Sequence, residues 1–326
     1  MKISVVICTR DREETISQAV ESVAKCDYPT FDIHVMDQST RPATRERVEE
    51  LATKFCDKVA IVYHHLDKAG LSRASNAGAR VSDGALIAYT DDDVIVPADW
   101  LAKIAQAFGA DPKAGLLYGQ VLVPDELKPR LKEGVIVPSL TWDKPERLIR
   151  GGKFKIWGMG ANMAITRVMF EDVGGFDEAL GGGGPLRSSQ DFDFAYRTFL
   201  RGYAILLEPT VMVDHYGTRT ADQWPDTMVN YGIGDGAFYS KHVRCGDMRA
   251  LRLLMKAYLL SRARELKHSL KVGRFERDAY SKSLVVGVRK AMPFGIDKRF
   301  RLYVETERAK IGVTQSNIVT ATKRQA

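Results

Sequence analysis

The sequence predicts an α/β protein with a mostly parallel central sheet, flanking helices and a helical C-terminal extension. In the first hundred residues, short β-prone runs alternate with segments of helical apolar spacing, which is the pattern of βαβ units. With 326 residues, 45% of them hydrophobic, the chain can bury a substantial core. The net charge is +7, but from Lys241 onward 21 Lys and Arg stand against 7 Asp and Glu, so residues 1–240 carry −7. An acidic body followed by a basic part points to two functional regions.

Each predicted strand is a short apolar run, and each predicted helix repeats apolar residues every three or four positions. The first strand, ISVVIC, begins at Ile3, and the helix after it places Ile16, Val20 and Val23 on one face. Strands are predicted at residues 3–8, 31–36, 59–64 and 85–90, with helices at 11–25, 45–55 and 72–81.

Polar side chains follow three of these strands at the point where each strand ends. In parallel sheets, ligands bind outside the carboxyl ends of the strands. We therefore expect the chemistry of the protein at this edge of the sheet. The residues concerned are Thr9, Arg10 and Asp11 after the first strand, Asp37 and Ser39 after the second, and Asp91, Asp92 and Asp93 after the fourth.

The three consecutive aspartates are the most informative of these residues. Adjacent carboxylates repel one another, so the arrangement is costly unless a divalent metal, a bound hydroxyl or bulk water relieves it. A hard cation such as Mg²⁺ or Mn²⁺ binds carboxylate oxygens and keeps positions open for phosphate oxygens. Taken alone, the DDD tripeptide also fits a solvated acidic turn.

Several classes of protein are disfavoured. No Gly-x-Gly-x-x-Gly follows the first strand and no phosphate-binding Gly-Lys-Ser/Thr loop is present, which argues against a dehydrogenase and a P-loop NTPase.

The spacing of Cys8, Cys26, Cys56 and Cys245 suits free thiols and no structural disulfide. The N-terminal residues lack a secretion pattern, and no apolar run approaches the roughly 18 residues needed to cross a bilayer. We expect a cytoplasmic protein, either free or peripheral on the inner face of the cell membrane.

Seven motifs follow one another along the chain: VVICTRD at 5–11, VMDQS at 35–39, GLSRASNAG at 70–78, DDDVIVP at 91–97, GANMA at 160–164, GGFDE at 174–178 and QDFDF at 190–194. Taken in this order, they resemble glycosyltransferase family 2, whose catalytic domains have the Rossmann-like GT-A fold. The resemblance spans roughly residues 3–220. It implies a catalytic domain at 1–235, with a donor half at about 1–98 and an acceptor half at about 115–220. A basic helical extension would follow at 236–313, and a disordered tail at 314–326.

The resemblance implies a nucleotide-diphosphate-sugar donor, most commonly UDP-linked in the family, and a Mn²⁺ or Mg²⁺ ion. Asp93 and Asp91 would hold the metal, with Asp91 also on the ribose side. His215 would complete the site, although a lone histidine at the end of a late strand is also commonly structural. The implied donor-binding residues are Thr9, Arg10, Asp11, Asp37, Ser39, Arg73, Asp91, Asp92 and Asn162.

The resemblance also implies that Asp191 is the catalytic base, which would remove a proton from the acceptor hydroxyl in an inverting reaction. Gln190 stands where a glutamate is common in the family, so Asp191 is the better supported of the two. Asp193 falls in a segment that reads as a core-facing helix, so we expect it either to be structural or to support the site from behind. The glycines at 181–184 form either a loop that closes over the substrates or a flexible connector, and Trp157 either faces the acceptor or belongs to the core.

The segment 247–271 has the pattern of a basic amphipathic helix, with leucines interleaved with Lys and Arg. Three interpretations compete: packing against the acidic body, docking on an anionic membrane near a lipid-linked acceptor, and binding of nucleic acid. Without an aromatic stacking platform or a nucleic-acid motif, we expect no nucleic-acid partner.

These observations favour a metal-dependent inverting glycosyltransferase acting on a glycan or lipid-linked glycan in the synthesis of cell-surface polysaccharides or glycoconjugates. One rival is a sugar-1-phosphate nucleotidyltransferase, whose glycine-rich basic signature is not matched by TRDRE at 9–13. The other is a non-catalytic module that binds nucleotides or glycans. Such a module would bind a donor without turnover.

Overall fold

The computed structural model describes residues 1–154, 158–272, 279–307 and 309. Trp157 and the predicted tail at 314–326 lie outside the described residues. The chain forms two compact units, one made of Met1–Phe176 with Asp191–Trp224 and the other of Asp177–Gln190 with Pro225–Ala326. The segment 177–190 therefore belongs with the C-terminal helices, although the motif series runs through it.

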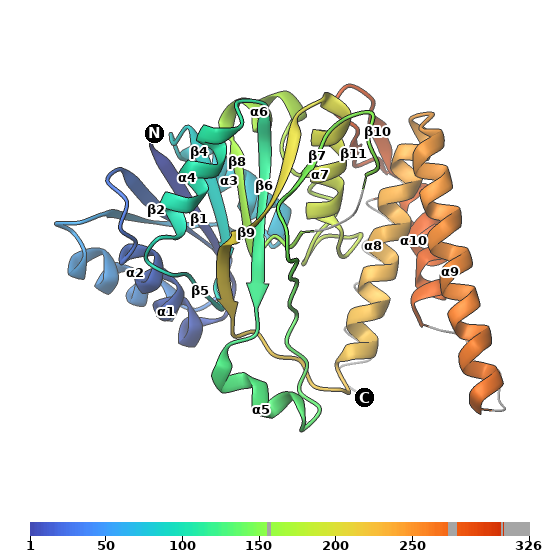
Figure 1. Cartoon of the computed structure of the whole chain (residues 1–326), viewed down its shortest axis with the longest axis horizontal. Helices are drawn as coiled ribbons and strands as arrows, with labels where there is room; N and C mark the ends of the chain where they lie inside the picture. Colours follow the sequence, from blue (N-terminus) through green and yellow to red (C-terminus); the bar gives the residue numbers. More distant parts are fainter. Residues whose placement is uncertain (155–157, 273–278, 308, 310–326) are drawn as a thin grey trace. The chain divides into compact units, whose positions relative to one another are not determined.

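The first unit is built on a nine-stranded sheet (Figure 1). Its strands are β1 (Ile3–Thr9), β2 (Phe31–Asp37), β3 (Ala60–His65), β4 (Leu86–Asp91), β5 (Val94–Ile95), β6 (Ala114–Leu122), β7 (Glu146–Leu148), β8 (Asn162–Thr166) and β9 (Ala204–His215). The order across the sheet is β3-β2-β1-β4-β8-β6-β9-β5, and β7 pairs with β9.

The parallel part of this sheet brings the predicted polar strand ends together. Strands β3, β2, β1 and β4 are parallel, as are β6 and β9, and antiparallel β8 lies between the two groups. In the register of these strands, Thr9 lies opposite Asp37, and Cys8 lies opposite Asp91. The predicted α/β fold with a central sheet and flanking helices is confirmed.

Helices cover both faces of the sheet. Alternate residues of each strand point to opposite faces, and in β1 and β2 the residues on both faces are buried. The helices of this unit are α1 (Glu13–Ala24), α2 (Ala43–Lys54), α3 (Leu71–Val81), α4 (Trp100–Ala110), α5 (Lys128–Leu131), α6 (Arg167–Val173) and α7 (Gln190–Arg201), with a 3₁₀ turn at Asp125–Leu127. From β1, Val5 packs in one core with residues of α1, α2 and α4, whereas Val6 packs in a second core with residues of α3, α6 and α7. The predicted apolar face of α1 is buried, including Ile16, Val20 and Val23.

The second unit contains helices α8 (Trp224–Arg244), α9 (Met248–Val272) and α10 (Ala279–Ala291), followed by strands β10 (Gly295–Asp297) and β11 (Leu302–Val304), which form a hairpin. Lys241 and Asp177 form an ion pair in which both side chains are fully buried. The backbone N–H of Tyr303 also donates to Asp177, at 2.9 Å. These contacts join the segment 177–190, α8 and the hairpin within one unit.

The four cysteines are free, in agreement with the prediction that they form no disulfide. Within the described ranges, no helix combines the length and the apolar character that crossing a bilayer requires.

Candidate functional site

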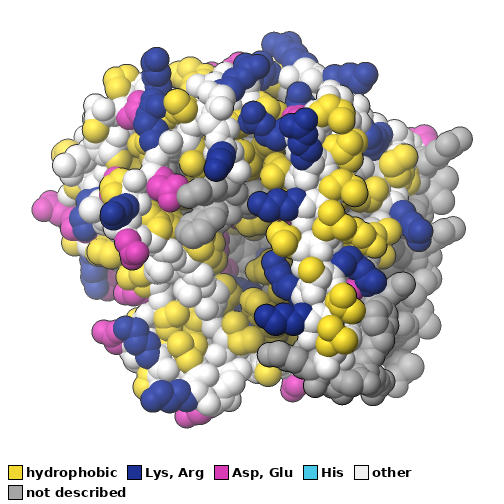
Figure 2. All heavy atoms as spheres, turned by 45° about the vertical axis from the view of Figure 1, so that its right-hand side comes forward, with side chains coloured by type: hydrophobic (Ala, Val, Ile, Leu, Met, Phe, Trp, Pro, Cys, Tyr) yellow, Lys and Arg dark blue, Asp and Glu magenta, His cyan; other side chains and the backbone are white. Residues whose placement is uncertain are grey.

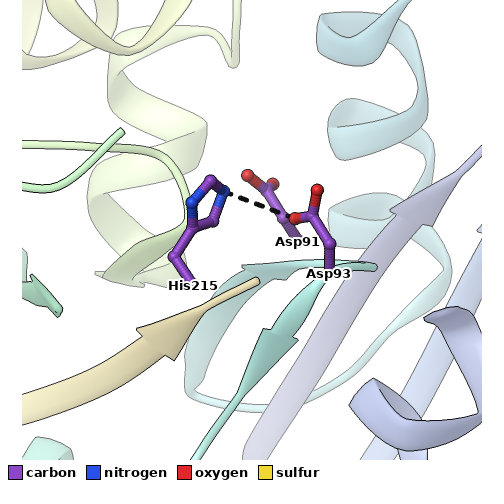
Figure 3. Close-up of side chains that lie close together, drawn as sticks. All are labelled: Asp91, Asp93 and His215. Carbon is purple, nitrogen blue, oxygen red and sulfur yellow. Dashed lines mark ion pairs between the residues drawn. The ribbon is translucent and has the colours of Figure 1, made fainter. Parts of the chain in front are cut away.

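Two carboxylates and an imidazole meet at the carboxyl edge of the sheet (Figure 3). Asp91 ends β4, Asp93 follows two residues later, and His215 ends β9. One ligand atom from each side chain lies within 4.8 Å of the others, so the three residues have a geometry that could hold a metal ion. His215 Nε2 lies 3.4 Å from Asp93 Oδ1, and both side chains are buried.

Short-range backbone contacts bring His215 to the two aspartates. Strand β5 pairs antiparallel with the end of β9, so that Val94 lies opposite His215. The backbone N–H of Tyr216 donates to the carbonyl of Asp93 at 2.8 Å. A Cβ atom at Gly217 would stand 2.5 Å from Asp93 Oδ2 and 2.8 Å from His215 Cε1, so glycine leaves open the space beside the cluster.

The surroundings of the cluster shift the pKa values of Asp91 and Asp93 in opposite directions. Burial and the nearby charge of Asp93 raise the pKa of Asp91 to about 7. For Asp93, burial works in the same direction, but His215 and Arg12 outweigh it and bring the pKa to about 2. Two neighbouring carboxylates in a buried site repel each other, and a bound cation would relieve that repulsion.

Arg12 was not predicted as a site residue, yet it lies directly on the acidic cluster. Its Nη1 lies 2.8 Å from Asp92 Oδ1 and 2.5 Å from Asp93 Oδ2. Thr9 Oγ1 donates to the other oxygen of Asp92, at 2.7 Å. Asp92 is thus bound by two side chains of the β1–α1 segment. In the sequence, Arg12 is marked only by its position shortly after the end of a strand. Arg10 has the same kind of position, so the sequence does not distinguish the two.

A second hydrogen-bond network surrounds the end of β2, where Asp37 is fully buried. Asp37 Oδ1 accepts from the backbone N–H of Ser39 at 2.8 Å, and Oδ2 accepts from Tyr63 Oη at 2.9 Å. Ser39 Oγ in turn accepts from the backbone N–H of Asp11 at 2.7 Å. The structure therefore brings Asp11, Asp37 and Ser39 together, and it adds Tyr63, which sequence reasoning did not select.

The two predicted arginines differ in their surroundings. The side chain of Arg10 is 52% exposed, with its Nε 3.6 Å from Asp11 Oδ2. Arg73 lies in the first turn of α3 and is half-buried. Gln38 binds the loop before α3, because its side chain donates to the carbonyls of Lys68 and Gly70 and accepts from the N–H of Gly70.

Asn162 is fully buried and bound by the protein on both sides of its amide. Its Oδ1 accepts from Trp100 Nε1 at 3.0 Å. Its Nδ2 donates to the carbonyls of Gln120 and Val211, at 2.8 and 3.1 Å. Asn162 therefore ties β8 to β6, β9 and α4, and these bonds occupy both ends of its amide.

Asp191 lies in the first turn of α7 and is partly accessible. Its Oδ2 accepts from the backbone N–H of Gly160 at 3.2 Å, and its Oδ1 accepts from the N–H of Phe192 at 2.9 Å. Tyr118 Oη donates to the Asp191 carbonyl at 3.0 Å. The carboxylate is thus held in one orientation in the first turn of α7.

Asp193, two residues further on, has a structural role. It is fully buried and pairs with Arg197 at 2.8 Å. Arg197 also donates to the carbonyls of Val173 and Gly175, at 2.8 and 2.7 Å.

A polar cavity of about 570 Å³ borders the acidic cluster. Asp11, Arg12, Arg41, Asp93, Tyr216 and Arg219 are among its lining residues. Asp93 therefore borders a cavity large enough for a charged ligand.

Solved structures with the same arrangement of elements define the class of fold as GT-A. A mannosyltransferase from Pyrobaculum calidifontis, solved with GDP-Man and Mn²⁺, aligns with a TM-score of 0.59 over 89% of this chain and 86% of that one, at 17% identity. Residues 1–349 of TarS from S. aureus, solved with UDP, align with a TM-score of 0.55 over 91% and 94%, at 18% identity. At such identities, the likeness shows the fold.

The sequence then gives the family. The glycosyl transferase family 2 model matches residues 4–173, more than half of the chain, and the chain belongs to that family. It is 28% identical to a glucosyl-dolichyl phosphate glucuronosyltransferase of Haloferax volcanii over 56% of this chain and 58% of that protein. It is 22% identical to a beta-monoglucosyldiacylglycerol synthase of Nostoc over 67% of this chain and 46% of that protein. The chain thus spans about half the length of these relatives.

Proposed function

We propose that this protein transfers a sugar from a nucleotide-diphosphate sugar to an acceptor hydroxyl, with a divalent metal ion and with inversion at the anomeric carbon. The observation that carries the proposal is the cluster of Asp91, Asp93 and His215 at the carboxyl edge of a GT-A sheet. Membership of family 2 supports the reaction type.

The proposed metal site is formed by Asp93, Asp91 and His215. Two carboxylates and an imidazole suit Mn²⁺ well, and the carboxylates also suit Mg²⁺. The absence of a side chain at Gly217, next to Asp93 and His215, supports this site. When bound, such an ion would neutralise the negative charge that develops on the diphosphate leaving group.

The proposed donor site lies along the ends of β1, β2 and β4. Asp37 and the residues bonded around it would hold the base and ribose, and the nearby arginines would face the diphosphate, for which a guanidinium is well suited. UDP is the preferred nucleotide of the proposal, although one structural neighbour was solved with GDP-Man. Asn162 is left out, because its amide is already bound by the protein. The proposed donor-binding residues are Thr9, Arg10, Asp11, Arg12, Asp37, Ser39, Arg73, Asp91 and Asp92.

Asp191 is the proposed catalytic base. Its carboxylate would accept the proton of the acceptor hydroxyl while that oxygen forms a bond to the anomeric carbon. The bond from the anomeric carbon to the diphosphate oxygen breaks, and the nucleoside diphosphate leaves with the electron pair. Attack on the face opposite the leaving group inverts the configuration. General-base help of this kind contributes about 10²–10⁴ in rate.

The proposed acceptor is a lipid-linked sugar or a related glycan, used on the cytoplasmic face of a membrane in glycoconjugate synthesis. Two relatives support this class, since the names of both refer to a lipid: a dolichyl phosphate and a diacylglycerol.

A panel of nucleotide sugars tests the proposal, with thermal unfolding measured with and without Mn²⁺. A donor at one hundred times its Kd stabilises the folded protein by about 2.7 kcal/mol. We expect one donor to raise Tm only with the metal, and Asp93→Asn to abolish that rise. Asp191→Asn should keep the rise in Tm but lose about 10²-fold or more of the transfer rate. Sugar transfer that survives both substitutions would contradict the proposed roles.

A further inference from the structure

The exposed side of α9 carries a continuous apolar stripe. Five large apolar residues of this helix are at least half exposed, and they follow one another at intervals of seven, four, seven and four residues. This spacing returns to one face of an α-helix every one or two turns. They are Met248 (62% exposed), Met255 (50%), Leu259 (58%), Leu266 (57%) and Leu270 (76%).

The side of α9 that packs inside its own unit has the opposite character. Its buried residues include Ser261, Glu265 and Ser269, which are small or polar. Glu265 is almost fully buried and bonded to Arg262 and Ser281. A surface helix normally buries its apolar stripe and exposes its polar one. In the C-terminal half of α9 this arrangement is reversed, whereas Leu251, Leu254 and Tyr258 of its N-terminal half are partly buried. An exposed apolar stripe of this length marks a contact surface.

Basic residues flank the stripe. Glu265 is the one acidic residue of α9 and is buried, so the exposed side of this helix presents cations without anions. Figure 2 shows hydrophobic and basic side chains next to one another on this face. The exposed basic residues are Arg249, Arg252, Lys256, Arg264 and Lys267.

We propose that this face of α9 docks on a membrane surface that contains anionic lipid. Leucine and methionine side chains would enter the boundary between head groups and acyl chains, while the flanking cations contact lipid phosphates. The long stems of Lys and Arg suit this position, because the charged end can stay in the polar layer. A second copy of the chain fits less well, since two such helices would bring cations against cations. Nucleic acid would leave the leucines without an apolar contact.

Flotation of the full chain with vesicles tests the proposal without any sugar donor, so its outcome is separate from that of the proposed transfer reaction. We expect binding to vesicles of phosphatidylcholine with about a third phosphatidylglycerol, and little binding to pure phosphatidylcholine. Because the Debye length shortens from about 10 Å at 0.1 M salt to about 3 Å at 1 M, high salt should weaken the binding.

Two double variants separate the two contributions. Leu259→Gln with Leu266→Gln keeps good helix formers but removes apolar contact, and should lower the bound fraction on anionic vesicles about tenfold. Arg252→Gln with Lys256→Gln should lower it by a similar factor at low salt and much less at high salt. Val168→Gln is the matched control, since Val168 is 69% exposed but lies on α6. It should bind like the wild type.

Circular dichroism of each variant reports whether the fold is kept, and light scattering gives the oligomeric state. Equal binding by the wild type and the leucine variant would overturn the proposal, as would equal binding to neutral and anionic vesicles. A dimer that the leucine variant converts to a monomer would instead assign the stripe to a second copy of the chain.

Discussion

The Arg12 guanidinium lies against two of three consecutive aspartates and neutralises part of their charge. Burial works to lower the pKa of Arg12, but Asp92 and Asp93 outweigh it and raise that pKa. A divalent cation at Asp93 would meet this guanidinium at short range. Arg12 and a bound metal ion would therefore compete for one carboxylate, and the strength of this competition can be measured without a sugar donor.

Arg12→Gln should tighten Mn²⁺ binding to the donor-free protein. Loss of one nearby positive charge is worth about 1 kcal/mol or more at this partly exposed site, which corresponds to about fivefold in Kd. Isothermal titration calorimetry gives the affinity directly. Arg10→Gln serves as the control, because Arg10 contacts Asp11 and should leave Mn²⁺ affinity unchanged. Weaker Mn²⁺ binding by Arg12→Gln would mean that Arg12 holds the cluster in shape.

Single residues of the site were predictable to different degrees. The position of the aspartates followed from the end of an apolar strand, and His215 followed from the family resemblance. Arg12 could not be told from Arg10 by pattern. Asp11, which lies between the two arginines, has a positive φ of 53°. The backbone therefore turns between Arg10 and Arg12, and the spacing of residues in a sequence does not predict a single dihedral angle.

Glycines decide how closely two helices of the second unit approach each other. A Cβ at Gly236 of α8 would stand 2.0 Å from the carbonyl oxygen of Leu284 in α10, and a Cβ at Gly287 would stand 2.0 Å from that of Ile233. Backbone therefore meets backbone where α8 and α10 cross. By contrast, a Cβ at Gly109 in α4 would have no neighbour within 4 Å.

These two environments give opposite expectations for the same substitution. Gly109→Ala should stabilise the protein by roughly 0.5–1 kcal/mol, because alanine favours the helix and the site has room. Gly236→Ala should destabilise it by about 1–3 kcal/mol, since overpacking outweighs the gain in helix propensity. Urea unfolding gives both values. An increase in the free energy of unfolding for Gly236→Ala would contradict this expectation, because it would mean that α8 and α10 can move apart without loss of stability.

Periodicity predicted seven strands and helices of the first hundred residues to within two residues, because buried faces repeat with the period of the element. The helix α1, for example, was expected at 11–25 and is found at Glu13–Ala24. For α9, periodicity gave the helix but not its orientation. The usual rule buries leucines, whereas the structure buries Ser261 and Glu265, and only the packing of neighbouring elements can decide between two candidate faces.

The stability of the whole molecule should depend on pH through the ion pair of Lys2 with Asp32, at 2.6 Å. Burial works to raise the pKa of Asp32, but the neighbouring side chains of His34, Lys2 and Ser4 outweigh it and lower that pKa below its usual range. A carboxyl group with a depressed folded pKa stabilises the fold fully above its unfolded pKa of about 4. That contribution is lost as the pH falls through the folded value.

The wild type should therefore lose stability as the pH falls below about 5, and Asp32→Asn should reduce that loss by about 1 kcal/mol or more. Urea unfolding at several values between pH 3 and 7 measures the slope. Asp83→Asn is the control, because Asp83 also contacts Lys2 but its side chain is 75% exposed. Equal slopes for the wild type and Asp32→Asn would rule out this origin of the acid sensitivity.

The chain leaves the first unit after Phe176 and returns to it at Asp191. In the intervening segment, Leu180 and Leu186 share an apolar cluster with Ala237 and Phe294, which come much later in the sequence. A protein shortened to residues 1–224 would therefore keep these leucines and lose the residues that cover them. The part of the chain that carries the proposed base is consequently not a module that a recombination event, or an engineer, can separate by a single cut.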